Sequence, residues 1–184
     1  MTPTQLLVPT YRQMLATLLA WLDKAEAAGG SGELLSARLA PDMFPLATQV
    51  RFACVQAWEG VARLKREPFP ATVNTLLDEG RNAGERPGSL ADARARLAET
   101  IAMLDALAPD ALDAEPEGMI VHDLPIGMTF DLTADQYARD WALPQFYFHV
   151  MTAYAILRNA GVALGKADFI PHMFAYLRQP AAAG

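Results

Sequence analysis

Three histidines have the widest chemical range of any side chains in this sequence: His122, His149 and His172. A neutral imidazole binds metal ions and accepts or releases a proton near neutral pH. A helical zinc or nickel site usually places two ligands one turn apart, but the positions four residues either side of His149 are Gln145 and Ala153. The local spacing therefore predicts no metal motif.

His149 remains the most informative single residue because it is ionisable within an apolar segment. That segment, Asp140–Arg158, has no formal charge between its two ends, and Pro144 within it leaves backbone groups free. Two interpretations stay open. The imidazole is neutral and hydrogen-bonded inside the core, or it is a ligand or acid–base group in a pocket.

Other reactive side chains have simpler interpretations. Cys54 lies on an apolar stripe without a neighbouring cation, which favours inert packing over nucleophilic use. Tyr11 and Tyr147 bring phenol groups toward the interior, where a tyrosine hydroxyl is usually hydrogen-bonded. Gln49 and Gln56 are seven residues apart and nearly superposed along one helix, so they are candidates to line an interior polar spot. The sequence has no glycine-rich phosphate loop, nucleophile elbow or cysteine cluster.

Helical periodicity predicts the elements that position these groups. A first helix is expected over residues 11–28. A second is expected to begin after its N-cap Asp42, with Pro45 in its first turn, and to end before Pro68. Residues 69–88 predict a long crossover with a short helix near 72–79. Such a crossover lets two neighbouring helices run parallel.

Capping motifs and two short β-like runs predict the elements in the second half of the chain. Ser89 and Asp92 predict the start of a third helix that ends near residue 107. Residues 118–122 and 128–132 predict a β-hairpin around a Pro/Gly turn. A capping box at residues 133–136 starts the last helix, which is apolar all round and hence the central buried helix; Pro144 should kink or break it.

Composition limits the class of protein. A chain of 184 residues, about half of them apolar, predicts one domain over residues 1–184 with its core at about 6–170. The net charge of -6 argues against a nucleic-acid partner, because the basic cluster Arg63, Lys65 and Arg66 is small and suits a helix C-terminus. The lone Cys54 and the lack of an evident signal peptide predict a cytoplasmic protein. The uncharged run is too short to span a membrane.

Four stretches of the chain are distinctive: residues 40–46 (APDMFPL), 143–150 (LPQFYFHV), 152–158 (TAYAILR) and 161–169 (GVALGKADF). Together they resemble an uncharacterised bacterial domain-of-unknown-function family within the DinB/YfiT-like superfamily. The resemblance implies an all-α fold: an up-up-down-down four-helix bundle with a long crossover and a small β-hairpin before the last helix. It also implies that a homodimer is common.

The resemblance implies a divalent metal held by three histidines, one on the second helix and two on the last, and in some relatives a thiol cofactor. Here the second helix has no histidine and the last has only His149, so no cofactor is predicted and a divalent metal would have an incomplete triad. The polar residues expected to converge at that place are His149, Tyr147, Gln49, Gln56 and Asp42.

Three functional hypotheses follow. The first is binding of a small molecule in a central cleft without the usual metal. The second is a divalent-metal- or thiol-dependent transferase or hydrolase in which His149 is a ligand or base. The third is a homodimeric interaction module.

Overall fold

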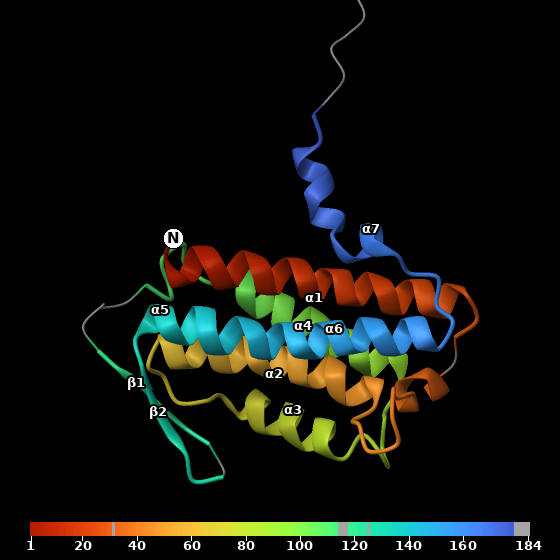
Figure 1. The fold of residues 1–184 in the computed structure, drawn as a ribbon, viewed down its shortest axis with the longest axis horizontal. Helices are drawn as coiled ribbons and strands as arrows, with labels where there is room; N and C mark the ends of the chain where they lie inside the picture. The colour runs from red at the N-terminus through yellow and green to blue at the C-terminus, as the bar shows by residue number, and fades with distance from the viewer. Residues whose placement is uncertain (31, 114–117, 125, 179–184) are drawn as a thin grey trace, which may run out of the picture.

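Four long helices form one bundle in a computed structural model that describes residues 1–30, 32–113, 118–124 and 126–178 (Figure 1). They are α1 (Pro3–Ala27), α2 (Leu46–Leu64), α4 (Leu90–Asp105) and α6 (Leu143–Asn159). The smaller elements are α3 (Ala71–Arg81), β1 (Ile120–Asp123), β2 (Thr129–Leu132), α5 (Ala134–Gln136) and α7 (Lys166–Phe169). The predicted all-α class with a small hairpin before the last helix is confirmed.

Side-chain contacts give the direction of each helix. Tyr11 stacks on Phe146 and Trp21 on Tyr154, so α1 and α6 run parallel. Arg94 near the start of α4 pairs with Asp23 near the end of α1, whereas Arg12 pairs with Asp105, so these two helices are antiparallel.

The remaining pair, α2 and α4, runs parallel. The Sγ of Cys54 lies 3.6 Å from the Arg96 carbonyl oxygen, and Trp58 donates to Thr100 one turn further along both helices. The order is therefore up, down, down, up, which differs from the expected up-up-down-down order. The physical reason is the crossover: α3 returns the chain to the starting end of α2, as the long 69–88 connection predicted.

Two helix starts differ from expectation. α1 begins at Pro3 rather than near Tyr11, because Thr2 and Gln5 form a capping box and Pro9 is accommodated inside the helix. The prediction that Asp42 caps α2 is wrong: the N-cap is Pro45, and Asp42 is exposed in the preceding turn. The Leu46 amide donates to the Ala37 carbonyl, so the chain turns a corner before the helix begins.

The elements after α2 follow the capping signals. α3 is two residues longer at its C-terminal end and one at its N-terminal end than the predicted 72–79, and α4 begins after the Ser89–Asp92 capping box. The hairpin pairs Ile120 with Leu132 in antiparallel register. Ile120 and His122 face inward, so β1 presents one apolar and one ionisable side chain to the helices.

Pro144 neither breaks nor ends the last helical segment. A π-helical turn, Tyr137–Ala142, precedes α6, and the Leu143 amide donates to the Ala138 carbonyl five residues back. A proline in a regular α-helix clashes with the carbonyl four residues earlier. The wider π turn accommodates that conflict while Leu143 keeps helical dihedral angles.

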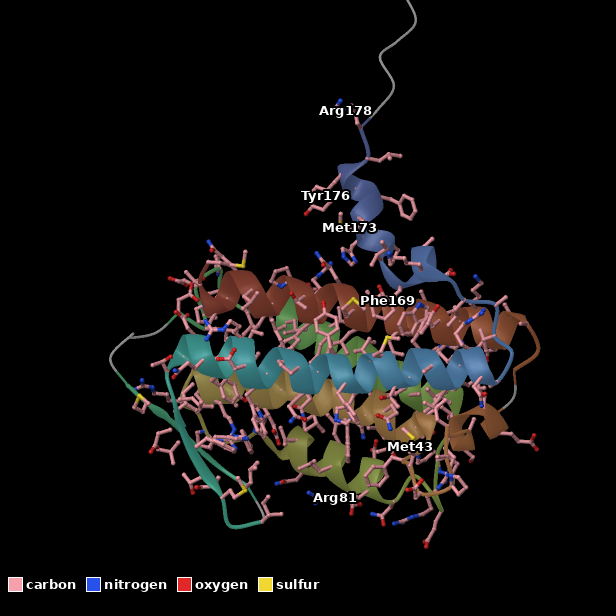
Figure 2. All side chains as sticks on the ribbon, in the orientation of Figure 1. Met43, Arg81, Phe169, Met173, Tyr176 and Arg178 are labelled. Carbon is pink, nitrogen blue, oxygen red and sulfur yellow. The ribbon has the colours of Figure 1, made fainter. Side chains whose placement is uncertain are left out.

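The C-terminal segment leaves the bundle. Phe169 packs on Trp21 of α1, and the Trp21 indole donates to the Asp168 carbonyl. Beyond it, Met173, Tyr176 and Arg178 stand away from the helices (Figure 2). Residues 179–184 lie outside the described residues. Among the helices described, none combines the length and apolar character needed to cross a membrane.

Candidate functional site

The structure brings Gln49 and His149 into direct contact between α2 and α6. The His149 Nδ1 lies 2.9 Å from the Gln49 Oε1, and the Gln49 Nε2 donates to the Phe44 carbonyl at 3.2 Å. Both side chains are buried, with 3% of Gln49 and 9% of His149 exposed. Two residues that are 100 positions apart in sequence thus form one polar pair in the core.

This pair fixes the tautomer of His149. The Phe44 carbonyl accepts only, so the Gln49 amide must turn its Nε2 toward Phe44 and its Oε1 toward the imidazole. The imidazole Nδ1 must then donate, which leaves a lone pair on Nε2. Burial lowers the pKa of His149 to about 4, so the ring is neutral at pH 7.

Aromatic rings surround the imidazole. Phe52 lies edge-on at 5.3 Å and Phe148 at 5.2 Å, and Phe44 packs on Phe52. The Phe52 ring packs directly on Gly80 of α3, so closely that a Cβ added at Gly80 would lie 2.4 Å from the ring. Since 59% of Phe148 is exposed, this aromatic group reaches the surface. The His149 Nε2 has no hydrogen-bond partner among the described residues. It is not one of the fully enclosed unpaired atoms there, so part of its surface is accessible.

The other three predicted site residues are not brought to this pair. Tyr147 is partly exposed and contacts Phe146; two residues along a helix turn its side chain roughly 200° from His149. Gln56 is about 10 Å along α2 from Gln49. Asp42 is exposed in the turn before α2. Their roles in a site stay predictions.

The donor set at His149 does not fit the metal that the resemblance implies. Among the residues that the structure describes, no group of three or more His, Cys, Asp or Glu side chains could hold a metal ion. Gln49, on the helix expected to supply a histidine, already uses its oxygen to accept from His149. The pair therefore offers one free nitrogen and no second ligand.

A second polar cluster was missed by sequence reasoning. It comprises Tyr11, Glu59, Arg63, His122 and Tyr137, and we call it the His122 cluster. Four enclosed polar atoms in it have no hydrogen-bond partner among the described residues: the Tyr11 hydroxyl, the Arg63 Nε and both ring nitrogens of His122. The expectation that the Tyr11 hydroxyl is satisfied is wrong in this structure.

Electrostatic influences show that these groups lie together. Burial, followed by the positive charge of Arg63, lowers the pKa of His122 to about 4. Burial raises the pKa of Glu59, and Arg63 opposes that shift. Burial also raises the pKa of Tyr11, with further contributions from Tyr137 and Glu59. Buried polar atoms without partners are rare in proteins, so the cluster requires a functional or structural explanation.

The π-helical turn positions one side of this cluster. The His122 ring packs 4.3 Å from Trp141 and 5.8 Å from Tyr137, both within Tyr137–Ala142. Such turns occur frequently at functional sites. In the sequence, the only signals were one histidine in a predicted strand and a proline seven residues after Tyr137.

Cys54 behaves as predicted for a packed thiol. It is fully buried, and burial raises its pKa to about 12. A thiolate is the nucleophilic form of cysteine, so this thiol is unreactive near neutral pH.

The fold is that of a DinB-like helical bundle. A crystal structure of a DinB family member protein from Shewanella denitrificans matches with a TM-score of 0.70 and 31% sequence identity, covering 98% of this chain and 95% of that chain. More narrowly, the chain belongs to the family described as domain of unknown function DUF1993, whose model matches residues 4–170. No curated protein matches the chain.

Proposed function

We propose that this protein binds a small, largely apolar molecule that donates one hydrogen bond to the Nε2 of His149. Two hydrogen bonds support this: the Gln49 Nε2 donates to the Phe44 carbonyl, and the Gln49 Oε1 accepts from the His149 Nδ1. They leave the Nε2 of His149 as an acceptor. A ligand placed there would meet aromatic rings and one acceptor. Few well-placed polar groups within an apolar lining are typical of small-molecule sites.

The pKa of His149 favours binding over proton abstraction. A general base is most effective when its pKa lies near the working pH. Burial holds the pKa of His149 at about 4, so Nε2 accepts a hydrogen bond readily but takes up a proton poorly at pH 7. For this reason we rank a binding function above the transferase or hydrolase alternative.

Two matched probes test the proposal. Phenol has an aromatic ring and one donor, whereas anisole has the ring without the donor. At about −0.6 kcal/mol per non-hydrogen atom, phenol would bind with a Kd of about 1 mM. We expect phenol to shift the ¹⁵N resonance of the His149 Nε2 saturably and anisole to leave it unchanged.

Variants locate the response. Gln49→Leu should weaken phenol binding because the Nδ1–H tautomer is no longer fixed. Gln56→Leu, on the same helix, is the matched control and should bind as the parent protein does. Equal responses to phenol and anisole would contradict the proposal.

Native mass spectrometry of untagged protein tests the metal alternative. The incomplete donor set leads us to expect no stoichiometric metal. One divalent ion per chain that disappears in His149→Phe would overturn the metal-free proposal and support the metalloenzyme alternative.

We also propose a homodimer through the outer face of α6. Phe148 and Met151 are large, apolar and exposed there, with 59% and 50% of their surfaces accessible. Neighbouring exposed apolar side chains favour an interface. Sedimentation velocity at micromolar concentration should give a dimer, and Met151→Lys should shift it to monomer. A monomeric parent protein would contradict this.

A further inference from the structure

The guanidinium of Arg63 has an unused pair of donors. Its Nη1 donates to the Val121 carbonyl at 3.3 Å, and its face lies 4.9 Å from the centre of the Phe69 ring. The Nε has no partner among the described residues, and no carboxylate among them forms an ion pair with Arg63. The Nε–H and Nη2–H bonds point the same way, as one fork.

A fork of this kind matches one chemical group closely. Two parallel N–H bonds of an arginine bind both oxygens of a carboxylate, and such charge-assisted bonds are about twice as strong as neutral ones. The Phe69 ring, which lies outside β1, packs on the Arg63 guanidinium, so part of the side chain's orientation is kept when β1 shifts.

Arg63 also lines a hollow of about 360 Å³. It is lined by Arg63, Arg66, Glu67, Phe69 and residues 119–121 of the hairpin. Two cations against one anion give it a net positive charge in a chain of net charge -6. Phe69 and the apolar hairpin residues supply a wall for a ligand's hydrocarbon portion. A volume of 300–1,000 Å³ is usual for small-ligand sites.

The His122 cluster supplies polar groups on the inner side of the same strand. His122 is 3% exposed, and neither of its ring nitrogens has a partner in the described part of the chain. Arg63 is common to the cluster and the hollow, since it lines the hollow and its charge lowers the pKa of His122. An incoming polar group would find unsatisfied donors and acceptors there.

We propose that Arg63 binds the carboxylate of a small ligand through Nε and Nη2, with the ligand's apolar portion in the hollow against Phe69. The Nε is enclosed in this structure, so β1 must shift to admit the carboxylate. This site is separate from His149: Gln49 and Arg63 are about 21 Å apart along α2.

Benzoate and benzamide are the probes, because they have similar shapes and differ in charge. NMR of protein labelled at arginine side chains follows the Arg63 Nε–H directly, and backbone amides follow the hairpin. We expect benzoate to shift the Arg63 Nε–H and the β1 amides saturably, and benzamide to shift neither.

Three variants sharpen the test. Arg63→Lys keeps the charge but lacks the fork, and should weaken benzoate binding at least about tenfold. Arg66→Lys, in the same hollow, should change it less than about twofold. His149→Phe should leave it unchanged, which distinguishes this site from the one proposed for phenol.

If the hairpin of the Arg63→Lys variant does not fold, the benzoate titration of the parent protein alone tests the proposal. No saturable benzoate shift at the Arg63 Nε–H overturns the proposal, as does a shift confined to other arginines. Equal responses to benzoate and benzamide would also overturn it, because the carboxylate would then have no role.

Discussion

His149 and His122 are both buried and neutral, yet only one of them has a partner. His149 lies between two long helices and its Nδ1 contacts the Gln49 oxygen at 2.9 Å. His122 lies between a two-stranded hairpin and the π-helical turn, packed on Trp141, with both nitrogens unpaired among the described residues. Long helices thus hold a histidine that is hydrogen-bonded, whereas two strands of four residues each cover a histidine cluster whose polar atoms lack partners.

The largest expected effect is a loss of stability in mild acid. The unfolded chain protonates both histidines below their ordinary pKa of 6.5, whereas the folded protein holds both pKa values at about 4. Stability is therefore fully present above pH 6.5 and falls as the pH drops toward 4. By pH 5 each histidine should cost about 2 kcal/mol, or about 4 kcal/mol for the two.

Urea unfolding at several pH values between 8 and 5 measures this. In each single variant, His149→Phe or His122→Phe, the free energy of unfolding should decrease by about half as much as in the parent protein. In Gln56→Leu it should decrease by the same amount as in the parent. A free energy of unfolding that stays constant from pH 6.5 to 5.5 would mean that neither imidazole is buried in its neutral form.

A smaller effect is expected from His149→Phe at pH 7.5. The substitution leaves the Gln49 Oε1 buried without a donor, which should lower the free energy of unfolding by about 2 kcal/mol. The double variant Gln49→Leu with His149→Phe should recover part of that loss, because it removes both polar partners. If the double variant is less stable than the sum of the two single effects, the pair is not an isolated unit.

The smallest effect has the opposite sign. His122→Phe replaces two unpaired nitrogens with carbon while keeping a flat ring against Trp141 and Tyr137. We expect the free energy of unfolding at pH 7.5 to rise by about 1 kcal/mol. Thermal or urea unfolding measures it. A destabilisation like that of His149→Phe would show that His122 has hydrogen-bond partners, such as ordered water, in solution.

The helical half of this comparison was accessible from sequence because helix faces follow a period of 3.6 residues. Periodicity placed Gln49 beside the apolar stripe of its helix and His149 within an apolar helix, and the resemblance implied that the two converge. The structure puts them in contact, and their role in a site stays a prediction. The same periodicity, applied more strictly, separates Tyr147 from His149. The prediction that Asp42 caps α2 was wrong because it rested on the preference of aspartate for N-cap positions. In the structure the Leu46 amide donates to the Ala37 carbonyl, and the chain turns there before the helix begins.

The His122 cluster could not be predicted in the same way. Alternation within β1 indicates that Ile120 and His122 share a face, but not which helix that face meets. The contact between Arg63 and Val121 joins residues 58 positions apart and has no local signature. Pro144 signalled an irregularity, although only the structure shows that a π-helical turn orients Tyr137 and Trp141 toward the hairpin.

The parallel packing of α1 on α6 has a consequence for synthesis of the chain. The contact between Tyr11 and Phe146 joins residues about 135 positions apart. At 5–20 residues per second, a ribosome takes roughly 7–27 s to add that intervening length. During that interval Tyr11 and Trp21 of the nascent α1 lack Phe146 and Tyr154, the rings of α6 on which they pack. The N-terminal helix therefore waits for the last helix before these two rings meet their aromatic partners.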